Sequence, residues 1–348
     1  NCRRQRQMCI RDRAWNPLRY TGLAGGAVYG LMARQFAPLE TRLAHVTERL
    51  EEFPRLFDQI RATLEPKRVP KVHAETAVKQ NRGVLSILDN MVKPHLGELA
   101  TGERSRLERA MATARAAVEE HQAWLESELL PKADGEFRLG AELYDQKLAF
   151  TLQTPLTRQE IRERADRQLR EIRDEMYGIS KEVYREQYPL TQFPANPSEE
   201  YKQAIIRACL ELAYRETPAA DAVVETARRS LEVTTAFVRD RDLVTVPPDP
   251  LEIIVRPEFQ RGVALAYCES PGPLDVGQKT FYAVAPLPDD WTDEQVRSFL
   301  REYNLRSLHN LTIHEAMPGH FLQLAHSNRY PGKLRAVLSS GVFIEGWA

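Results

Sequence analysis

The chain has 348 residues, a length typical of one large domain or of two to three ordinary ones. Its 48 lysine and arginine residues balance 49 aspartate and glutamate residues, which excludes a strongly basic protein that binds nucleic acid by neutralising phosphates. Hydrophobic residues make up 43%, and no run approaches the roughly 20 apolar residues of a membrane span. We therefore expect a globular protein with a sizeable core, no nucleic-acid partner and no membrane-spanning segment.

Residues 1–13 stand apart from the rest of the chain. They read "NCRRQRQMCIRDR", with five arginines, two cysteines and no apolar periodicity. This segment resembles a translated sequencing adapter, so we predict that it is non-native or disordered and that the native N-terminus is missing. The sequence therefore leaves a cytoplasmic and a periplasmic location equally open, and it does not indicate an oligomeric state.

Residues 14–245 are predicted to form a large helical array. Apolar residues recur there at three- and four-residue steps, the period of one helix face. Thr157 and Glu160 form a capping box that predicts a helix start, with Pro155 just before it. The expected helices cover residues 39–50, 75–96, 104–130, 157–184, 201–214 and 220–239.

Residues 246–348 are predicted to hold a small β-sheet followed by further helices, continuous with the preceding array. Residues 246–250 read "VPPDP" and predict an extended linker. Short β-type runs follow at 251–255, 263–268 and 280–285. We interpret 280–285 as an edge strand, in which Tyr282 and Ala283 hold a peptide by main-chain pairing. The helical period resumes after a second capping box, Thr292 with Gln295.

The clustering of histidines near the end of the chain indicates a candidate metal site. Four of the eight lie between His309 and His326, around the sequence "HEAMPGH" that runs from His314 to His320. The zinc-peptidase pattern H-E-x-x-H places two histidines one helical turn apart as metal ligands and uses the glutamate as general base. Here the histidines are six residues apart, which in an unbroken helix turns them about 120° from each other and separates them by about 9 Å. We predict a bulge at Pro318-Gly319 that restores the pair.

Zinc requires a third protein ligand and an open position for water. Glu345 is the candidate, because a turn at 329–332 and a helix over 334–347 would return the chain to the histidines. With zinc on His314, His320 and Glu345, we expect Glu315 to take a proton from the attacking water and pass it to the leaving amine. The predicted substrate is a short peptide.

The segments "HEAMPGHFLQ" (314–323) and "FIEGWA" (343–348) resemble the bacterial domain-of-unknown-function family 885 (DUF885), whose members carry H-E-x-x-P-G-H and then E-G-W-A. The family is similar in layout to helical zinc peptidases such as thimet oligopeptidase and carboxypeptidase Taq. Dipeptidyl peptidase III shows that such a motif tolerates an inserted residue. The resemblance implies a zinc-dependent peptidase with a mainly α, zincin-like (gluzincin-like) and glutamate-ligated fold. Its members continue past E-G-W-A, so we expect a C-terminally truncated fragment whose oxyanion-stabilising residues lie beyond Ala348, and the activity of the fragment itself is left open.

Two other functions remain open. The same scaffold fits a zinc hydrolase of a non-peptide amide or ester. It also fits a non-catalytic helical scaffold in which the Pro-Gly insertion has destroyed the metal site. Side-chain specificity and the choice between exo- and endo-cleavage are not indicated by the sequence.

Overall fold

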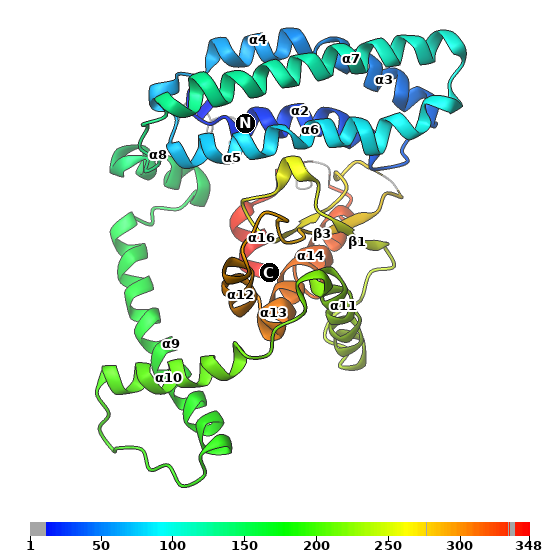
Figure 1. The fold of residues 1–348 in the computed structure, drawn as a ribbon. Coiled ribbons are helices and arrows are strands. Elements are labelled where there is room, and N and C mark those ends of the chain that lie inside the picture. The colour runs from blue at the N-terminus through cyan, green and yellow to red at the C-terminus, as the bar shows by residue number, and fades with distance from the viewer. Residues whose placement is uncertain (1–11, 276, 333, 335–337) are drawn as a thin grey trace. The chain divides into compact units, whose positions relative to one another are not determined.

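A computed structural model of the chain describes residues 12–275, 277–332, 334 and 338–348. The predicted mainly α fold with a small sheet is confirmed (Figure 1). The chain divides into two compact units that interleave along the sequence. Unit 1 comprises Asn1–Phe150, Pro247–Ala285 and Leu324–Ser339, and unit 2 comprises Thr151–Val246, Pro286–Gln323 and Ser340–Ala348. One boundary, between Val246 and Pro247, falls at the predicted proline-rich linker.

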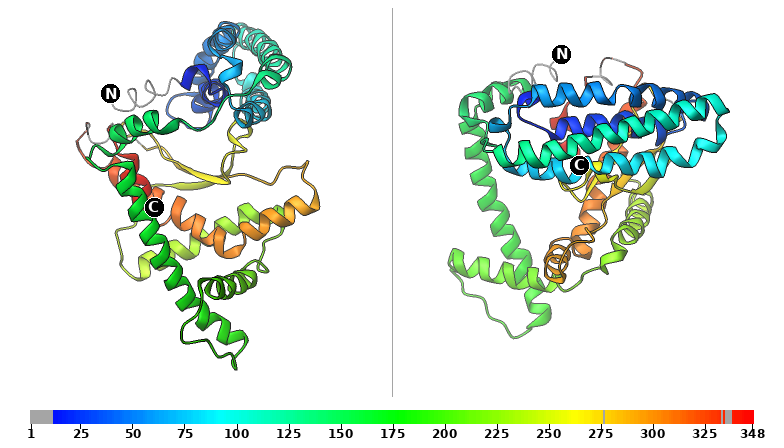
Figure 2. Two further views of the ribbon diagram at one scale, coloured as in Figure 1. Left: turned by 90° about the vertical axis from the view of Figure 1, so that its left-hand side faces the viewer. Right: turned by 45° about the horizontal axis from the view of Figure 1, so that its top comes forward.

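Unit 1 begins with a layered helical array. Helices α3, α4 and α7 pack side by side, and α2, α5 and α6 form the layer next to them. Figures 1 and 2 both show these two layers. Residues 1–11, which belong to the segment 1–13 predicted to be non-native or disordered, lie outside the described residues. The helices are α2 (Leu18–Met32), α3 (Leu39–Glu51), α4 (Phe53–Thr63), α5 (Lys71–Asn81), α6 (Gly83–Ile87) and α7 (Thr101–Trp124), and α8 (Gly140–Leu152) continues from unit 1 into unit 2.

The core of this array follows the predicted apolar periodicity. Leu43 and Leu50 of α3 are fully buried, and so is Leu107 of α7, the helix against which α3 packs. Phe53 and Phe57 at the start of α4 meet edge to face at 5.7 Å between ring centroids. Burial of each such side chain contributes roughly 1.5–3 kcal/mol to the free energy of unfolding.

The sheet of unit 1 consists of β1 (Leu251–Val255), β2 (Ala266–Glu269) and β3 (Thr280–Val284). The strand order is β1-β3-β2, with β1 parallel and β2 antiparallel to β3. The prediction that Tyr282 and Ala283 lie on an edge strand is therefore wrong. Their main-chain groups are enclosed between two neighbouring strands, and both side chains are fully buried. These residues cannot pair with a peptide.

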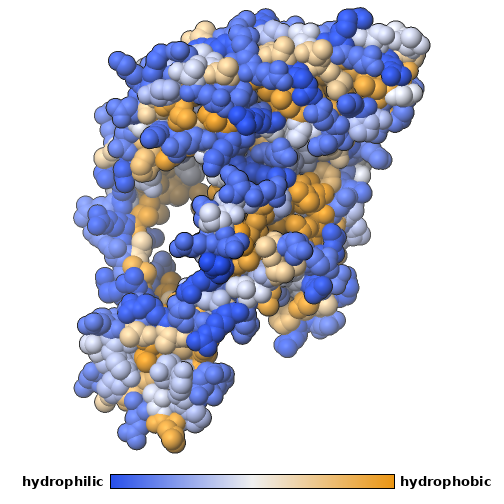
Figure 3. Space-filling model, in the orientation of Figure 1, coloured by the Kyte–Doolittle hydropathy of each residue, from blue (hydrophilic) through white to orange (hydrophobic). Residues whose placement is uncertain are grey.

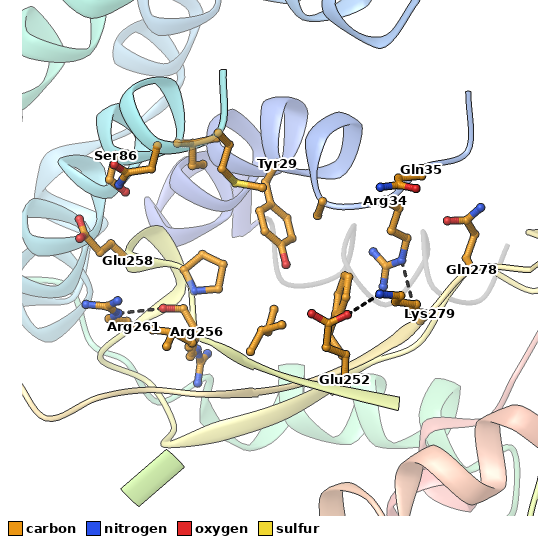
Figure 4. A pocket seen from close by; sticks show the side chains of 18 of the residues that line it. Tyr29, Arg34, Gln35, Ser86, Glu252, Arg256, Glu258, Arg261, Gln278 and Lys279 are labelled. Atoms are coloured by element: carbon orange, nitrogen blue, oxygen red, sulfur yellow. Dashed lines mark hydrogen bonds and ion pairs between the residues drawn. The ribbon is translucent and has the colours of Figure 1, made fainter. Parts of the chain in front are cut away.

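One face of the sheet carries side chains that contact Arg34, which lies just after the end of α2. Arg34 lies 4.6 Å from the ring centroid of Phe281, and it forms a 2.6 Å ion pair with Glu269. A cavity of about 610 Å³ lies within unit 1 along this face, as Figure 4 shows from close by. Tyr29 of α2 and Glu252 of β1 are among its lining residues. The candidate metal ligands all lie in unit 2 and do not line it.

Unit 2 is helical in its described residues. Both predicted capping boxes are confirmed: Thr157 caps α9 with Glu160, and Thr292 caps α12 with Gln295. Helix α10 packs on α9, and α13 packs on α11. The helices are α9 (Arg158–Gln187), α10 (Glu199–Ala213), α11 (Val223–Asp240), α12 (Asp293–Glu302), α13 (Leu305–Glu315) and α16 (Gly341–Trp347), and α14 (His320–Asn328) continues from unit 2 into unit 1.

The exterior of the helices is largely polar. Hydrophilic residues dominate the face of the molecule drawn in Figure 3 and cover most of its helices. Among the described residues, no helix is both long and apolar enough to span a membrane.

Candidate metal centre

The first half of the histidine motif lies at the end of α13. Asn304 caps this helix by accepting hydrogen bonds from the backbone N–H groups of Arg306 and Ser307, both at 3.1 Å. The helix is held against α11 partly by His309, whose Nδ1 lies 2.6 Å from Ser230 Oγ. It ends at Glu315, so His314 and Glu315 occupy its last turn.

The segment that follows differs from the prediction. A single helix with a bulge was expected, but the helix stops completely, and residues 316–319 form a non-helical connection before α14 starts at His320. Ala316 leaves the helix with φ −123° and ψ −86°. Pro318 has no N–H to continue the helical ladder, and the Met317–Pro318 peptide bond is cis. Gly319 N–H instead donates to the carbonyl of Ile313 at 2.9 Å.

Position 319 requires glycine, because its backbone packs closely against the backbone at the end of α13. A Cβ atom on this residue would lie 1.8 Å from the carbonyl oxygen of His314 and 2.4 Å from that of Ile313. No side chain fits such a space. Because Gly319 lets the connection fold directly against the end of α13, His320 returns to the level of His314.

The side chains of the two histidines and of Glu315 lie close together. The rings of His314 and His320 lie 4.6 Å apart between centroids, at 71° to each other. Ligand atoms from His314, Glu315 and His320 all lie within 4.8 Å of one another. The six-residue spacing therefore does not separate the pair, because the broken helix removes the 3.6-residue period on which the separation depended.

Glu345 reaches the same point from α16. Its Oε2 lies 3.6 Å from Nε2 of His320 and 3.9 Å from Nε2 of His314. Four tetrahedral bonds of 2.0–2.1 Å to zinc would place neighbouring donor atoms about 3.3–3.4 Å apart. The observed separations of 3.6 and 3.9 Å exceed that value by about 0.2–0.6 Å.

Helix α16 begins at Gly341, whereas the predicted helix begins at residue 334. Ser340 caps it at Phe343 N–H, at 3.5 Å, and residues 333 and 335–337 lie outside the described residues. The indole N–H of Trp347 donates a 2.8 Å hydrogen bond to the carbonyl of Pro318. This bond joins the helix that carries Glu345 to the connection between the two histidines. Trp347 lies in the "FIEGWA" segment, but the local sequence pattern indicates no role for it.

The electrostatics favour metal ligation by His320. Burial lowers the pKa of His320, the charge of His314 lowers it further, and Glu345 opposes both effects. A lowered pKa keeps the imidazole neutral, which is the form that binds a metal. Two imidazoles and one glutamate carboxylate are the donor set of one class of catalytic zinc sites. The residues present therefore fit a zinc ion.

The match to known proteins covers nearly the whole chain. The model of the family described as "Bacterial protein of unknown function (DUF885)" matches residues 2–348, and the chain belongs to this family. Among solved structures, the chain is similar to one described as a putative lipoprotein of unknown function from Shewanella oneidensis. The two share 30% sequence identity with a TM-score of 0.65, over 97% of this chain and 60% of that one. None of the curated proteins compared with the chain matches it.

Proposed function

We propose that the chain is a zinc-dependent peptidase that hydrolyses short peptides. The observation that carries the proposal is the convergence of three donors from three separate segments. Nε2 of His314 and Nε2 of His320 both lie within 3.9 Å of one carboxylate oxygen of Glu345. Exposed carboxylates are common without a metal. Two imidazole nitrogens close to the same carboxylate oxygen, however, are the arrangement expected of the ligands of a zinc ion.

Each residue then has a chemical role. His314, His320 and Glu345 would hold the ion, which when bound polarises the scissile carbonyl and acidifies a water molecule. Glu315 follows His314 directly, and its side chain is buried beside the histidines. In this role its carboxylate takes the proton of the attacking water and delivers it to the leaving amine.

Metal analysis tests the ligand set. We expect about one zinc per chain after purification with zinc present, as for a three-ligand site, and a loss of zinc in His314→Ala, His320→Ala and Glu345→Ala. As a matched control, His45→Ala removes an exposed histidine of α3 and should leave the zinc content unchanged. Negligible zinc in the wild type, or equal zinc in the ligand variants, would overturn the proposal.

Catalysis is tested separately with Glu315→Gln. This variant should retain zinc and lose turnover, because the amide has no basic carboxylate to accept the proton. Cleavage of a mixture of short peptides is followed by mass spectrometry. If the zinc-loaded wild type cleaves amide or ester compounds and no peptide, the alternative hydrolase takes precedence. A wild type that binds no zinc would favour the non-catalytic scaffold, in which the metal site is destroyed.

A further inference from the structure

Two buried polar atoms on α14 have no hydrogen-bond partner among the described residues. They are Nδ1 of His320 and Oε1 of Gln323. Each residue is 8% exposed, so water does not readily compensate either atom. The large majority of buried side-chain polar atoms in proteins are paired, so two unpaired atoms on one helix require an explanation.

The positions of the two residues allow them to meet. They are three residues apart on one helix, a spacing that makes side chains neighbours with about 5–6 Å between Cβ atoms. The backbone of Gln323 is fixed, because its N–H donates to the carbonyl of Gly319 at 3.1 Å. One atom is a ring nitrogen that can carry a proton, and the other is an amide oxygen that accepts one.

We propose that Gln323 is a positioning residue for the metal centre, and that its side-chain carbonyl accepts a hydrogen bond from Nδ1–H of His320 when a metal is bound. This inference rests on the proposed zinc site. A neutral imidazole carries one proton, so a proton held at Nδ1 leaves the lone pair on Nε2. Nε2 is the atom that lies 3.6 Å from Glu345 Oε2.

The hydrogen bond would act on the metal through His320 alone. A partner on the second nitrogen fixes the tautomer and ring orientation of a ligating histidine and raises the basicity of the ligating nitrogen. Gln323 itself does not need to touch the metal or the substrate.

The test compares zinc affinities, measured by competition with a chromophoric chelator. Gln323→Leu removes the acceptor and should weaken zinc binding about 10- to 100-fold, the usual effect of losing such a partner. Gln323→Glu restores an acceptor oxygen at the same reach and should recover most of the affinity. Gln168→Leu makes the same change at an exposed position of α9 and should have no effect.

A second measurement does not depend on any variant. In zinc-loaded wild-type protein labelled with ¹⁵N-histidine, NMR should show His320 with its proton on Nδ1, protected from exchange with solvent. This readout remains decisive if Gln323→Leu fails to fold.

The outcomes separate this inference from the proposed function. If the wild type binds zinc and Gln323→Leu binds it equally well, or if Nδ1–H exchanges freely, the role of Gln323 is refuted and the zinc site stands. If the wild type binds no zinc, the proposed function falls and the inference falls with it.

Discussion

The sharpest prediction concerns Gly319→Ala. The added methyl group would lie 1.8 Å from the carbonyl oxygen of His314, whereas ordinary contact begins near 3.4 Å. The end of α13 and the connection after it must therefore separate by about 1.6 Å, the difference between these two distances. Functional constellations tolerate errors of only about 0.5 Å. We expect zinc affinity to fall at least about 100-fold, at the upper end of the losses seen when a ligand's supporting contacts are removed.

The stability of this variant should also fall. Inserting a methyl group into a tightly packed place typically costs about 1–3 kcal/mol of unfolding free energy. Gly178→Ala is the matched control, because nothing lies within 4 Å of the corresponding Cβ inside α9. The control should gain about 0.4–1 kcal/mol from the smaller entropy of its unfolded chain.

The assays are chelator competition for zinc affinity and urea unfolding for stability, applied to both variants. A Gly319→Ala protein that binds zinc like the wild type would refute the reasoning. It would show that His314 and His320 converge without the close approach of their backbones.

Three further predictions follow from other contacts. Trp347→Phe keeps an aromatic ring but loses the hydrogen bond to Pro318, so we expect roughly tenfold weaker zinc binding in a chelator competition. The control Trp291→Phe makes the same change at a ring packed on a neighbouring aromatic and should bind zinc normally. Burial, and after it the charge of a nearby arginine, lowers the pKa of His121 from 6.5 to about 4. The unfolded chain therefore takes up the proton first as the pH falls, and the free energy of unfolding should drop between pH 6.5 and about 4 by up to about 3 kcal/mol. His121→Phe should flatten this drop in urea titrations at successive pH values, and an unchanged slope would contradict the assignment. Zinc at 100 times its dissociation constant should add about 2.7 kcal/mol to the free energy of unfolding. Thermal unfolding with and without a chelator measures this gain. The gain should vanish in His314→Ala.

Local signals in the sequence determined much of the helical framework. The capping boxes at Thr157 and Thr292 begin helices in the structure, and the strand predicted at 251–255 has those bounds. These features depend on residues within one or two turns of each other, so no distant contact is needed to establish them. The identities of the candidate metal donors also came from the sequence, because few residue types can ligate zinc.

The tertiary structure decided how those pieces meet. The middle position of β3 depends on pairing with β1, about 30 residues earlier in the chain, and this pairing places Tyr282 and Ala283 away from any edge. The complete break after Glu315 depends on how closely Gly319 approaches the end of α13. The hydrogen bond of Trp347 to Pro318 joins residues that are 29 positions apart in the chain. Strand order, close backbone approach and long-range hydrogen bonds are set by the packing of distant segments, which the local periodicity of a sequence does not encode.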